Sequence, residues 1–198
     1  MKAGEHVFAR EGFWGAHVTQ IAEEAGCSVG SFYRRFKDKE ALFFALQTDM
    51  AEHAKRNIDA AFDDPNWLTS PLPEMFEQLM RNTARTIVRI QGYYRALYEM
   101  SLRGHKVWDP MRALERHQGE RIAGMLEARG ISIKHDDVVT AAQLAVRMIN
   151  GLLISSVIHQ AAPYRSDDPK LHREMALILT RYLGIEPTRT RKERPKDD

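Results

Sequence analysis

The chain has a single cysteine, Cys27, among its 198 residues. A lone thiol cannot form an internal disulfide, so the fold does not depend on an oxidising compartment. We expect Cys27 to be a small buried hydrophobic residue. A redox-sensing thiol is the alternative, although the sequence offers it no partner cysteine.

Long apolar runs are also lacking. A membrane helix needs about 20 predominantly apolar residues. The longest candidate, Val138 to His159, is interrupted by Gln143, Arg147 and Asn150. The N-terminal residues Met-Lys-Ala-Gly-Glu-His contain no apolar signal core. The sequence therefore predicts a protein without a membrane span, located by default in the cytoplasm.

Patterns that carry catalysis or hold metals are missing too. No two of the eight histidines have the i, i+4 spacing that places a pair of ligands on one helical face. The sequence has no phosphate-binding glycine loop, no nucleophile elbow and no cysteine pair. We therefore predict no enzyme activity, no metal and no cofactor, and a helical-bundle enzyme is the weakest hypothesis.

Excess charge of one sign is absent as well. The formal net charge is +2 and the isoelectric point is about 8.7, which is weak support for a nucleic-acid partner. Residues 1–50 hold six basic and seven acidic side chains, a net charge of −1. Four of those six basic residues fall between positions 34 and 39, so the distribution is more informative than the sum.

Helical periodicity is present along nearly the whole chain. We find no alternating apolar and polar run long enough for a sheet, and the eight prolines lie between or at the ends of helical segments. The sequence therefore predicts an all-α fold of about nine helices. Their expected ranges are 1–11, 18–25, 29–36, 39–62, 73–90, 93–103, 110–129, 136–160 and 169–183.

Two short helices and a tight turn are predicted between residues 18 and 36. The first helix buries one stripe, and Gly26 follows where a helix end favours a left-handed residue. Ser28 is a favoured N-cap for the second helix, which we expect to bury Val29, Phe32 and Phe36. The stripe of the first helix consists of Val18, Ile21, Ala22 and Ala25.

This arrangement is typical of the helix-turn-helix, whose second helix enters the major groove of DNA. Gly30 lets a backbone come close, and Ser31 can bond base edges or phosphate. Tyr33 and Arg34 can reach phosphates, and Arg34 or Arg35 could instead contact guanine. Lys39 opens the next helix, where a cation and free amides can hold the DNA backbone. A helical hairpin with a solvated basic face is the alternative.

The N-terminal quarter resembles the DNA-binding domain of tetracycline-repressor (TetR) family regulators. The similarity comprises an Ile-Ala-x-x-Ala-Gly helix and turn, a Gly-Ser-Phe-Tyr recognition helix and a Phe-Lys-x-Lys-Glu-x-Leu helix entry. It runs over Phe8 to Phe13 and Val18 to Phe43. The all-helical remainder of roughly 150 residues also has the length that the family uses.

The resemblance implies an Ω-shaped homodimer with a variable C-terminal ligand domain. Positions 33 and 39 match the phosphate-contacting residues of the family, and positions 29, 30, 31 and 34 match those that usually read bases. The DNA contacts that the resemblance implies are Thr19, Ser28, Val29, Gly30, Ser31, Tyr33, Arg34 and Lys39.

Three departures from the family pattern stand out. The family usually has Thr or Ser where His17 stands, so the cap of the second helix is expected to be weaker or shifted to Thr19. Cys27 replaces a common Val, which is a mild change. The family normally has a basic arm and a longer first helix before the position of Met1, and the lack of such an arm in residues 1–50 would explain their net charge of −1.

The resemblance also implies the division of the chain. We expect a helix-turn-helix domain over residues 1–45, a helical ligand-binding and dimerisation domain over 46–187, and a disordered charged tail over 188–198. The two helices around 136–160 and 168–183 are expected to pair with their copies in a second chain. Gly151, Ser155 and Ser156 would permit close approach, and ordinary intramolecular core is the alternative.

A ligand pocket is expected among the aromatic and methionine residues of the middle helices, because such linings suit an apolar or aromatic molecule. Most of these side chains could equally be core. Arg147 and Asn150 are polar residues in an apolar helix and could contact a ligand or the dimer partner. The expected pocket residues are Phe76, Met80, Tyr94, Tyr98, Trp108, Met111 and Arg147.

The sequence thus predicts a DNA-binding transcriptional regulator, a repressor that a small hydrophobic or aromatic ligand releases. Its expected partners are double-stranded operator DNA, a small-molecule effector and a second copy of the chain, without a membrane. A helical ligand- or partner-binding module with weak or lost DNA binding is the alternative.

Overall fold

The computed structural model describes residues 1–104, 107–159 and 164–185. These residues form ten helices and no strand, so the all-α prediction is confirmed. The expected charged tail lies outside the described residues. The helices are α1 Lys2–Gly15, α2 Val18–Glu24, α3 Val29–Arg35, α4 Lys39–Phe62, α5 Asn66–Thr69, α6 Leu72–Arg89, α7 Gln91–Ser101, α8 Asp109–Ala128, α9 Val138–His159 and α10 Pro169–Tyr182.

Nine of these helices correspond to the nine predicted ranges. The short helix α5 is the exception, because it lies in the segment expected to be a loop. Its first turn is built locally: the Asp64 carboxylate accepts a hydrogen bond from the Asn66 backbone N–H at 3.0 Å. A four-residue helix is too short to give a periodic apolar pattern, so the sequence carries no signal for it.

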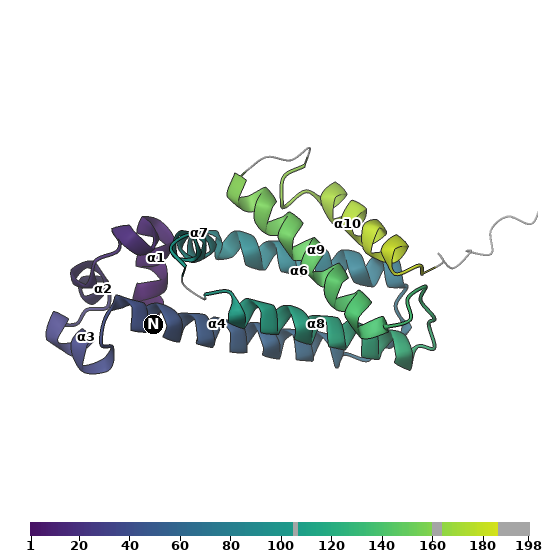
Figure 1. Cartoon of the computed structure of the whole chain (residues 1–198), viewed down its shortest axis with the longest axis horizontal. Coiled ribbons are helices and arrows are strands. Elements are labelled where there is room, and N and C mark those ends of the chain that lie inside the picture. The colour runs from purple at the N-terminus through teal and green to yellow at the C-terminus, as the bar shows by residue number, and fades with distance from the viewer. Residues whose placement is uncertain (105–106, 160–163, 186–198) are drawn as a thin grey trace, which may run out of the picture.

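The helices α1, α2 and α3 lie together at one end of an elongated molecule and form its N-terminal unit (Figure 1). Helix α4 leaves this unit and runs along the body beside α8. Helix α9 crosses the body diagonally and packs on α8, and α10 lies against α6 on the side away from α4. Helix α4 crosses the expected domain boundary between residues 45 and 46 without a break, so the division into two domains stays a prediction.

The start of α4 is fixed by a local cap. The Asp38 carboxylate accepts a hydrogen bond from the Ala41 backbone N–H at 2.7 Å, which satisfies one of the amides left free at a helix N-terminus. The same device starts α10, where the Asp168 carboxylate accepts from the Lys170 backbone N–H at 2.8 Å. Helix α4 begins and ends at the predicted residues, and α10 begins at the predicted residue.

Helix α1 departs from its prediction. Gly12 was expected to end the helix, and it does break the helical geometry, with φ 71° and ψ 179°. One further turn nevertheless follows, so that α1 reaches Gly15. A backbone in this left-handed region favours glycine, which explains the residue at position 12.

An aromatic cluster joins the N-terminal unit to the body. Phe43 of α4 stacks on Tyr93 of α7 with ring centroids 4.7 Å apart, and meets Phe8 of α1 edge-on at 5.1 Å. The Tyr93 hydroxyl donates a hydrogen bond to the Phe43 carbonyl at 3.1 Å. Burial raises the pKa of Tyr93 well above its ordinary value, so the ring remains a neutral donor. The unit therefore shares one continuous core with the body.

Helix α9 has two apolar faces, as its composition predicts. One face is buried against α8, α6, α7 and α10. On the other face Leu144, Met148 and Leu152 are 46%, 42% and 41% exposed. The segment Val138–Val157 is long and apolar enough to cross a membrane by length and composition alone, which is weak evidence because the core helix of a soluble protein passes the same test.

Candidate nucleic-acid interface

The turn between α2 and α3 is short and left-handed at its second residue. Gly26 has φ 63°, and no heavy atom lies within 4 Å of the place a Cβ would take. The Cys27 N–H donates to the Ala22 carbonyl at 2.9 Å, which closes the end of α2. Cys27 is exposed, so the expectation of a buried residue is wrong: the turn lifts its side chain off the core. Ala25 is exposed for the same reason.

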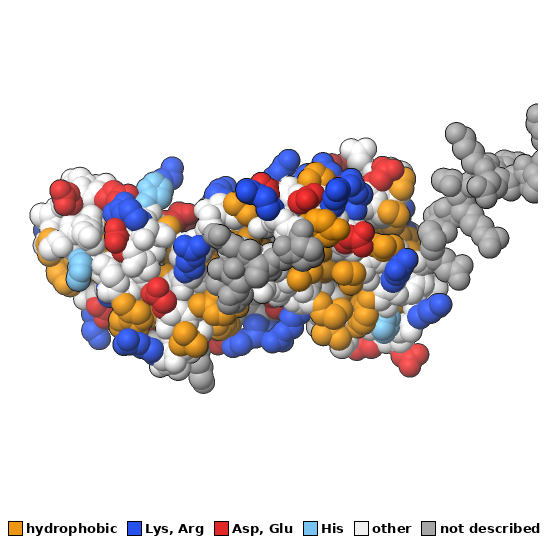
Figure 2. All heavy atoms as spheres, turned by 90° about the horizontal axis from the view of Figure 1, so that it is seen from above, with side chains coloured by type: hydrophobic (Ala, Val, Ile, Leu, Met, Phe, Trp, Pro, Cys, Tyr) orange, Lys and Arg blue, Asp and Glu red, His pale blue; other side chains and the backbone are white. Residues whose placement is uncertain are grey.

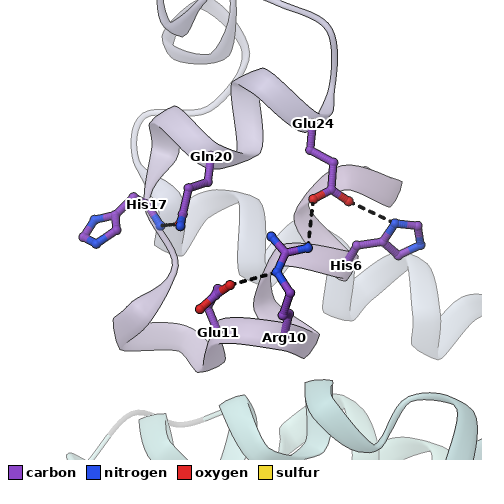
Figure 3. A network of polar contacts seen from close by, with 6 residues as sticks. All are labelled: His6, Arg10, Glu11, His17, Gln20 and Glu24. Carbon is purple, nitrogen blue, oxygen red and sulfur yellow. Dashed lines mark hydrogen bonds and ion pairs between the residues drawn. The ribbon is translucent and has the colours of Figure 1, made fainter.

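His17 is the N-cap residue of α2, and its side chain makes no capping hydrogen bond, which agrees with the expected weaker cap. Its backbone N–H donates to the Gln20 side-chain oxygen at 2.9 Å, which is half of a capping box (Figure 3). The helix begins at Val18, so the cap is not shifted to Thr19. Thr19 is exposed in the first turn, where a helix N-terminus presents free amides.

Helix α2 is anchored to α1 by polar contacts on the outside of the unit. Glu24 of α2 contacts the His6 ring at 3.1 Å and the Arg10 guanidinium at 3.3 Å, and Arg10 also reaches Glu11 at 2.8 Å (Figure 3). These groups are largely exposed, so each pair contributes little to stability. Arg10, one of the six basic residues among residues 1–50, is thus paired with acidic side chains of α1 and α2 and not with a group on α3.

A chain of hydrogen bonds runs along α3. Ser28 caps the helix, because its Oγ accepts from the Ser31 backbone N–H at 3.1 Å. The Ser31 hydroxyl lies 3.0 Å from the Ser28 hydroxyl and accepts from the Arg34 guanidinium at 2.7 Å. Ser28, Ser31 and Arg34 are thereby brought together on one face.

The same helix leaves a mixed surface open to solvent. Phe32 is 5% exposed and holds α3 to the core, whereas Tyr33 is 53% exposed. Val29 is 38% exposed, so the expectation that it is buried is wrong, and it joins Gly30 and Tyr33 on the open surface. The predicted base-reading positions are therefore accessible, except that Ser31 is half-buried.

Lys39, a predicted DNA contact, is already bonded within the N-terminal unit. Its ammonium donates to the carbonyls of Phe13 and Ala16 at 2.9 Å each and to that of Trp14 at 3.3 Å. Burial lowers the pKa of Lys39, an effect that the charge of Glu99 opposes. The ammonium uses its three protons to hold the C-terminal end of α1, so a phosphate contact would have to compete with these carbonyls.

Two of the cavities lined by described residues of the body adjoin one another. One of about 410 Å³ lies between α4, α6, α7 and α8, and the other, of about 370 Å³, lies between α7, α8 and α9. Tyr94, Leu114 and Asn150 line both, so the two adjoin. Volumes of this size are typical of small-molecule sites.

Five of the seven expected pocket residues line the second cavity, namely Tyr94, Tyr98, Trp108, Met111 and Arg147. Phe76 is fully buried core, and Met80 borders only a void of about 10 Å³. Helix α6 turns both side chains into the contact with its neighbours, where no room is left for a ligand. The prediction that Phe76 and Met80 line the pocket is therefore wrong.

Glu115 is a cavity residue that sequence inspection missed. Burial raises the pKa of its carboxyl, whereas a hydrogen bond from Asn150 and the charges of Arg147 and Arg112 lower it. All four residues line the second cavity. A lone glutamate within a charged helix carries no signal in the sequence, because its position inside a cavity depends on α9 packing beside it.

Two family models match the chain. The one described as bacterial regulatory proteins, tetR family, covers residues 1–46, and the one described as tetracyclin repressor-like, C-terminal domain, covers residues 71–183. The chain belongs to the TetR family of transcriptional regulators. TetR regulators are DNA-binding proteins and not enzymes, as the sequence predicts.

Curated relatives match a smaller part of the chain. YerO of Bacillus subtilis, named as an uncharacterised HTH-type transcriptional regulator, is 32% identical over 32% of this chain and 29% of its own. YdgC of the same organism, named in the same way, is 38% identical over 28% of this chain and 29% of its own. The matches thus span less than a third of the length of these relatives.

Solved structures agree with the fold over almost the whole chain. A TetR-family regulator from Mesorhizobium loti has a TM-score of 0.74 at 18% identity, covering 93% of this chain and 94% of its own. FadR of Bacillus subtilis, solved in complex with stearoyl-CoA, has a TM-score of 0.67 at 17% identity, covering 93% and 97%. Identities this low show a shared TetR fold and nothing more specific.

Proposed function

We propose that this TetR-family chain is a homodimeric repressor that binds an operator through α3 and leaves it when a small hydrophobic or aromatic ligand binds in the body. The observation that carries the proposal is the open face of α3, where Ser28, Ser31 and Arg34 form one hydrogen-bonded chain beside the exposed Tyr33. Such a helix presents polar groups that match base edges and phosphates in the major groove.

The exposed stripe of α9 supports a homodimer. Leu144, Met148 and Leu152 lie one turn apart on one face, and Leu177 and Ile178 of α10 are 40% and 48% exposed. Figure 2 shows apolar side chains gathered over α9 and α10 on the face seen from above. Exposed apolar patches of this kind mark protein–protein contacts, and pairing two chains would join two copies of α3 on one DNA duplex.

The two adjoining cavities support a ligand that is largely apolar. The first is lined by Ile58, Phe62 and Trp67 among others, and the second by Tyr98 and Trp108. The similar fold of FadR has been solved with stearoyl-CoA, which carries a long apolar chain. A ligand can release DNA only if it binds one arrangement of the dimer better than the other.

The test is fluorescence polarisation of labelled DNA from the region upstream of the chain's own gene, with a scrambled duplex as control. The protein is the 198-residue chain. We expect tighter binding to the upstream DNA and a steep loss of affinity with salt, because phosphate contacts release counterions. Equal or undetectable binding to both duplexes would overturn the proposal.

One observation favours the alternative of a module with lost DNA binding. Lys39 and Arg10 are both engaged within the N-terminal unit, and the first 50 residues carry a net charge of −1. The salt dependence of binding separates the two hypotheses. A weak DNA-binding module binds the upstream DNA at low salt and releases it as the salt concentration rises, whereas a partner-binding module binds neither duplex at any salt concentration.

A further inference from the structure

Helix α7 lies against α1 at backbone distance. Gly92 faces the backbone of Ala9, and a Cβ at position 92 would lie 2.2 Å from the Ala9 carbonyl oxygen. No side chain fits between the two helices at this point. Because their backbones are in contact, a displacement of α7 is transmitted to α1. The N-terminal unit and the body therefore have a stiff mechanical contact.

Glu99, two turns further along α7, reaches the break in α1. Its carboxylate oxygens lie 2.5 Å and 2.8 Å from the place a Cβ of Gly12 would take, so the carboxylate fills the room that glycine leaves. One of these oxygens accepts a hydrogen bond from the Phe13 backbone N–H at 2.9 Å. Because Gly12 leaves helical geometry, Glu99 supplies the acceptor for this amide.

The Phe13 peptide is held from its other side by α4. Its carbonyl accepts from the Lys39 ammonium at 2.9 Å, and the ammonium lies 4.9 Å from the Phe13 ring centroid. Phe13 thus bridges an acid of α7 and a base of α4. Lys39 also bonds Ala16, the last residue before α2 and its cap, so the arrangement fixes where the helix-turn-helix begins.

The residue before Glu99 on α7 points in a different direction. Tyr98 lines the cavity of about 370 Å³ and meets the Trp108 ring edge-on at 5.1 Å. Just beyond the helix, the Arg103 guanidinium lies 4.2 Å from the Trp14 ring centroid, which adds a second link to the end of α1. The last turn of α7 therefore carries one side chain into the cavity and another to the break in α1.

We propose that Glu99 is a positioning residue that couples the cavity at Tyr98 to the N-terminal unit through Phe13 and Lys39. A molecule that displaces the rings of Tyr98 and Trp108 shifts the end of α7, and the carboxylate of Glu99 carries the shift to Phe13. The idea that this coupling carries a signal from the effector to the DNA rests on the proposed function. The mechanical coupling itself involves only contacts within this chain.

The experiment is amide hydrogen exchange followed by NMR on the full chain, with Phe13 as the reporter. Loss of a charged acceptor weakens the bond that protects this amide. We expect Phe13 to exchange roughly threefold faster in Glu99→Gln and roughly tenfold faster in Glu99→Ala. Glu120→Gln, an exposed acid on α8, is the matched control and should leave Phe13 unchanged.

The coupling is tested by a cavity lesion in both backgrounds. Trp108→Ala removes the ring that packs on Tyr98, and we expect it to change Phe13 exchange about threefold in the otherwise natural chain and not at all in Glu99→Ala. Trp67→Ala is the control lesion, because Trp67 packs on Phe62 and lines the other cavity. The Ile122 amide, inside α8 and on a residue that is fully buried, reports any global loss of stability.

Unchanged Phe13 exchange in both Glu99 variants overturns the proposal. It is also overturned if Trp108→Ala acts equally in both backgrounds, or if Trp67→Ala acts on Phe13 as strongly as Trp108→Ala. No DNA and no effector enter these measurements. Their failure therefore leaves the proposed repressor function untouched, and failure of operator binding leaves the coupling standing.

Discussion

The guanidinium of Arg34 lies across the open face of α3, held by the Ser31 hydroxyl at 2.7 Å. Ser31 is itself positioned by Ser28, which caps the helix. A side chain that is already ordered loses less entropy when it meets a ligand. At the scale of single residues, this ordering favours a base contact by Arg34 and a less specific role for the unbonded, exposed Tyr33.

Arg34→Ala should therefore reduce sequence discrimination. We expect the ratio of affinities for selected over scrambled DNA to fall by roughly tenfold to a hundredfold, since one good base contact contributes about 1–3 kcal/mol. Tyr33→Ala should weaken binding to both duplexes alike. Polarisation titrations on both duplexes check this, and equal losses for the two variants would show that the assignment of roles is wrong.

Glu115 gives a pH dependence of stability. Its folded pKa lies above its ordinary value because of burial, so the folded protein holds the proton more tightly than the unfolded chain. The resulting contribution to the free energy of unfolding is fully present below the pKa that Glu115 has in the unfolded chain. It is lost as the pH rises through the pKa that Glu115 has in the folded protein. Glu115→Gln should thus gain stability relative to the natural chain as the pH rises from about 4 to 7.

Urea unfolding at a series of pH values measures this difference. Glu127→Gln, an exposed acid of the same helix, is the control and should give a nearly flat difference across the series. A flat difference for Glu115→Gln as well would contradict the burial of its carboxyl.

At the scale of elements, two glycines of α8 sit in opposite environments. A Cβ at Gly119 would lie 2.6 Å from Cγ and 2.7 Å from Cα of Gln143 on α9, whereas nothing lies within 4 Å of the same position at Gly124. Gly119 therefore sets the distance between α8 and α9, and Gly124 has no such role.

Gly119→Ala should destabilise the fold by about 1–3 kcal/mol, because the backbones of α8 and α9 must separate. Gly124→Ala should stabilise it by about 0.5–1 kcal/mol through helix propensity. Thermal and urea unfolding of the pair give the comparison. Stabilisation by both changes would mean that α8 and α9 are not in close contact.

The helix limits were predictable wherever a local cap fixes them. Asp38 and Ser28 form bonds within three residues of themselves, so sequence spacing alone locates the starts of α4 and α3. Lys39 shows the opposite case. Its three carbonyl partners lie 23 to 26 residues away, and the break at Gly12 brings them within reach, which no local pattern encodes.

At the scale of the whole molecule, the pocket illustrates the same limit. Tyr98 and Trp108 were expected there and do line it, but Phe76 has the same composition signal and lies in the core. Only the packing of α7, α8 and α9 decides which aromatic faces a cavity. The exposed apolar stripe of α9 could be predicted from the sequence, because apolar residues on both sides of a helix imply two packing partners.

The stripe predicts a variant that breaks the dimer. Met148→Glu puts a charge at the centre of the exposed apolar stripe, and we expect the dimer dissociation constant to rise by about thirtyfold or more. Val88→Glu, at a 36% exposed apolar position of α6, is the matched control and should leave the dimer intact. Light scattering coupled to size-exclusion chromatography measures the mass. A monomeric natural chain, or a dimeric Met148→Glu, would contradict the assignment.

Selection from a random duplex library tests whether α3 reads DNA in a two-fold symmetric dimer. We predict enrichment of a palindromic motif whose half-sites lie one helical turn of DNA apart or a multiple of it, and loss of that enrichment in Arg34→Ala. Recovery of no motif by the natural chain, or of the same motif by the natural chain and the variant, would contradict DNA reading by α3.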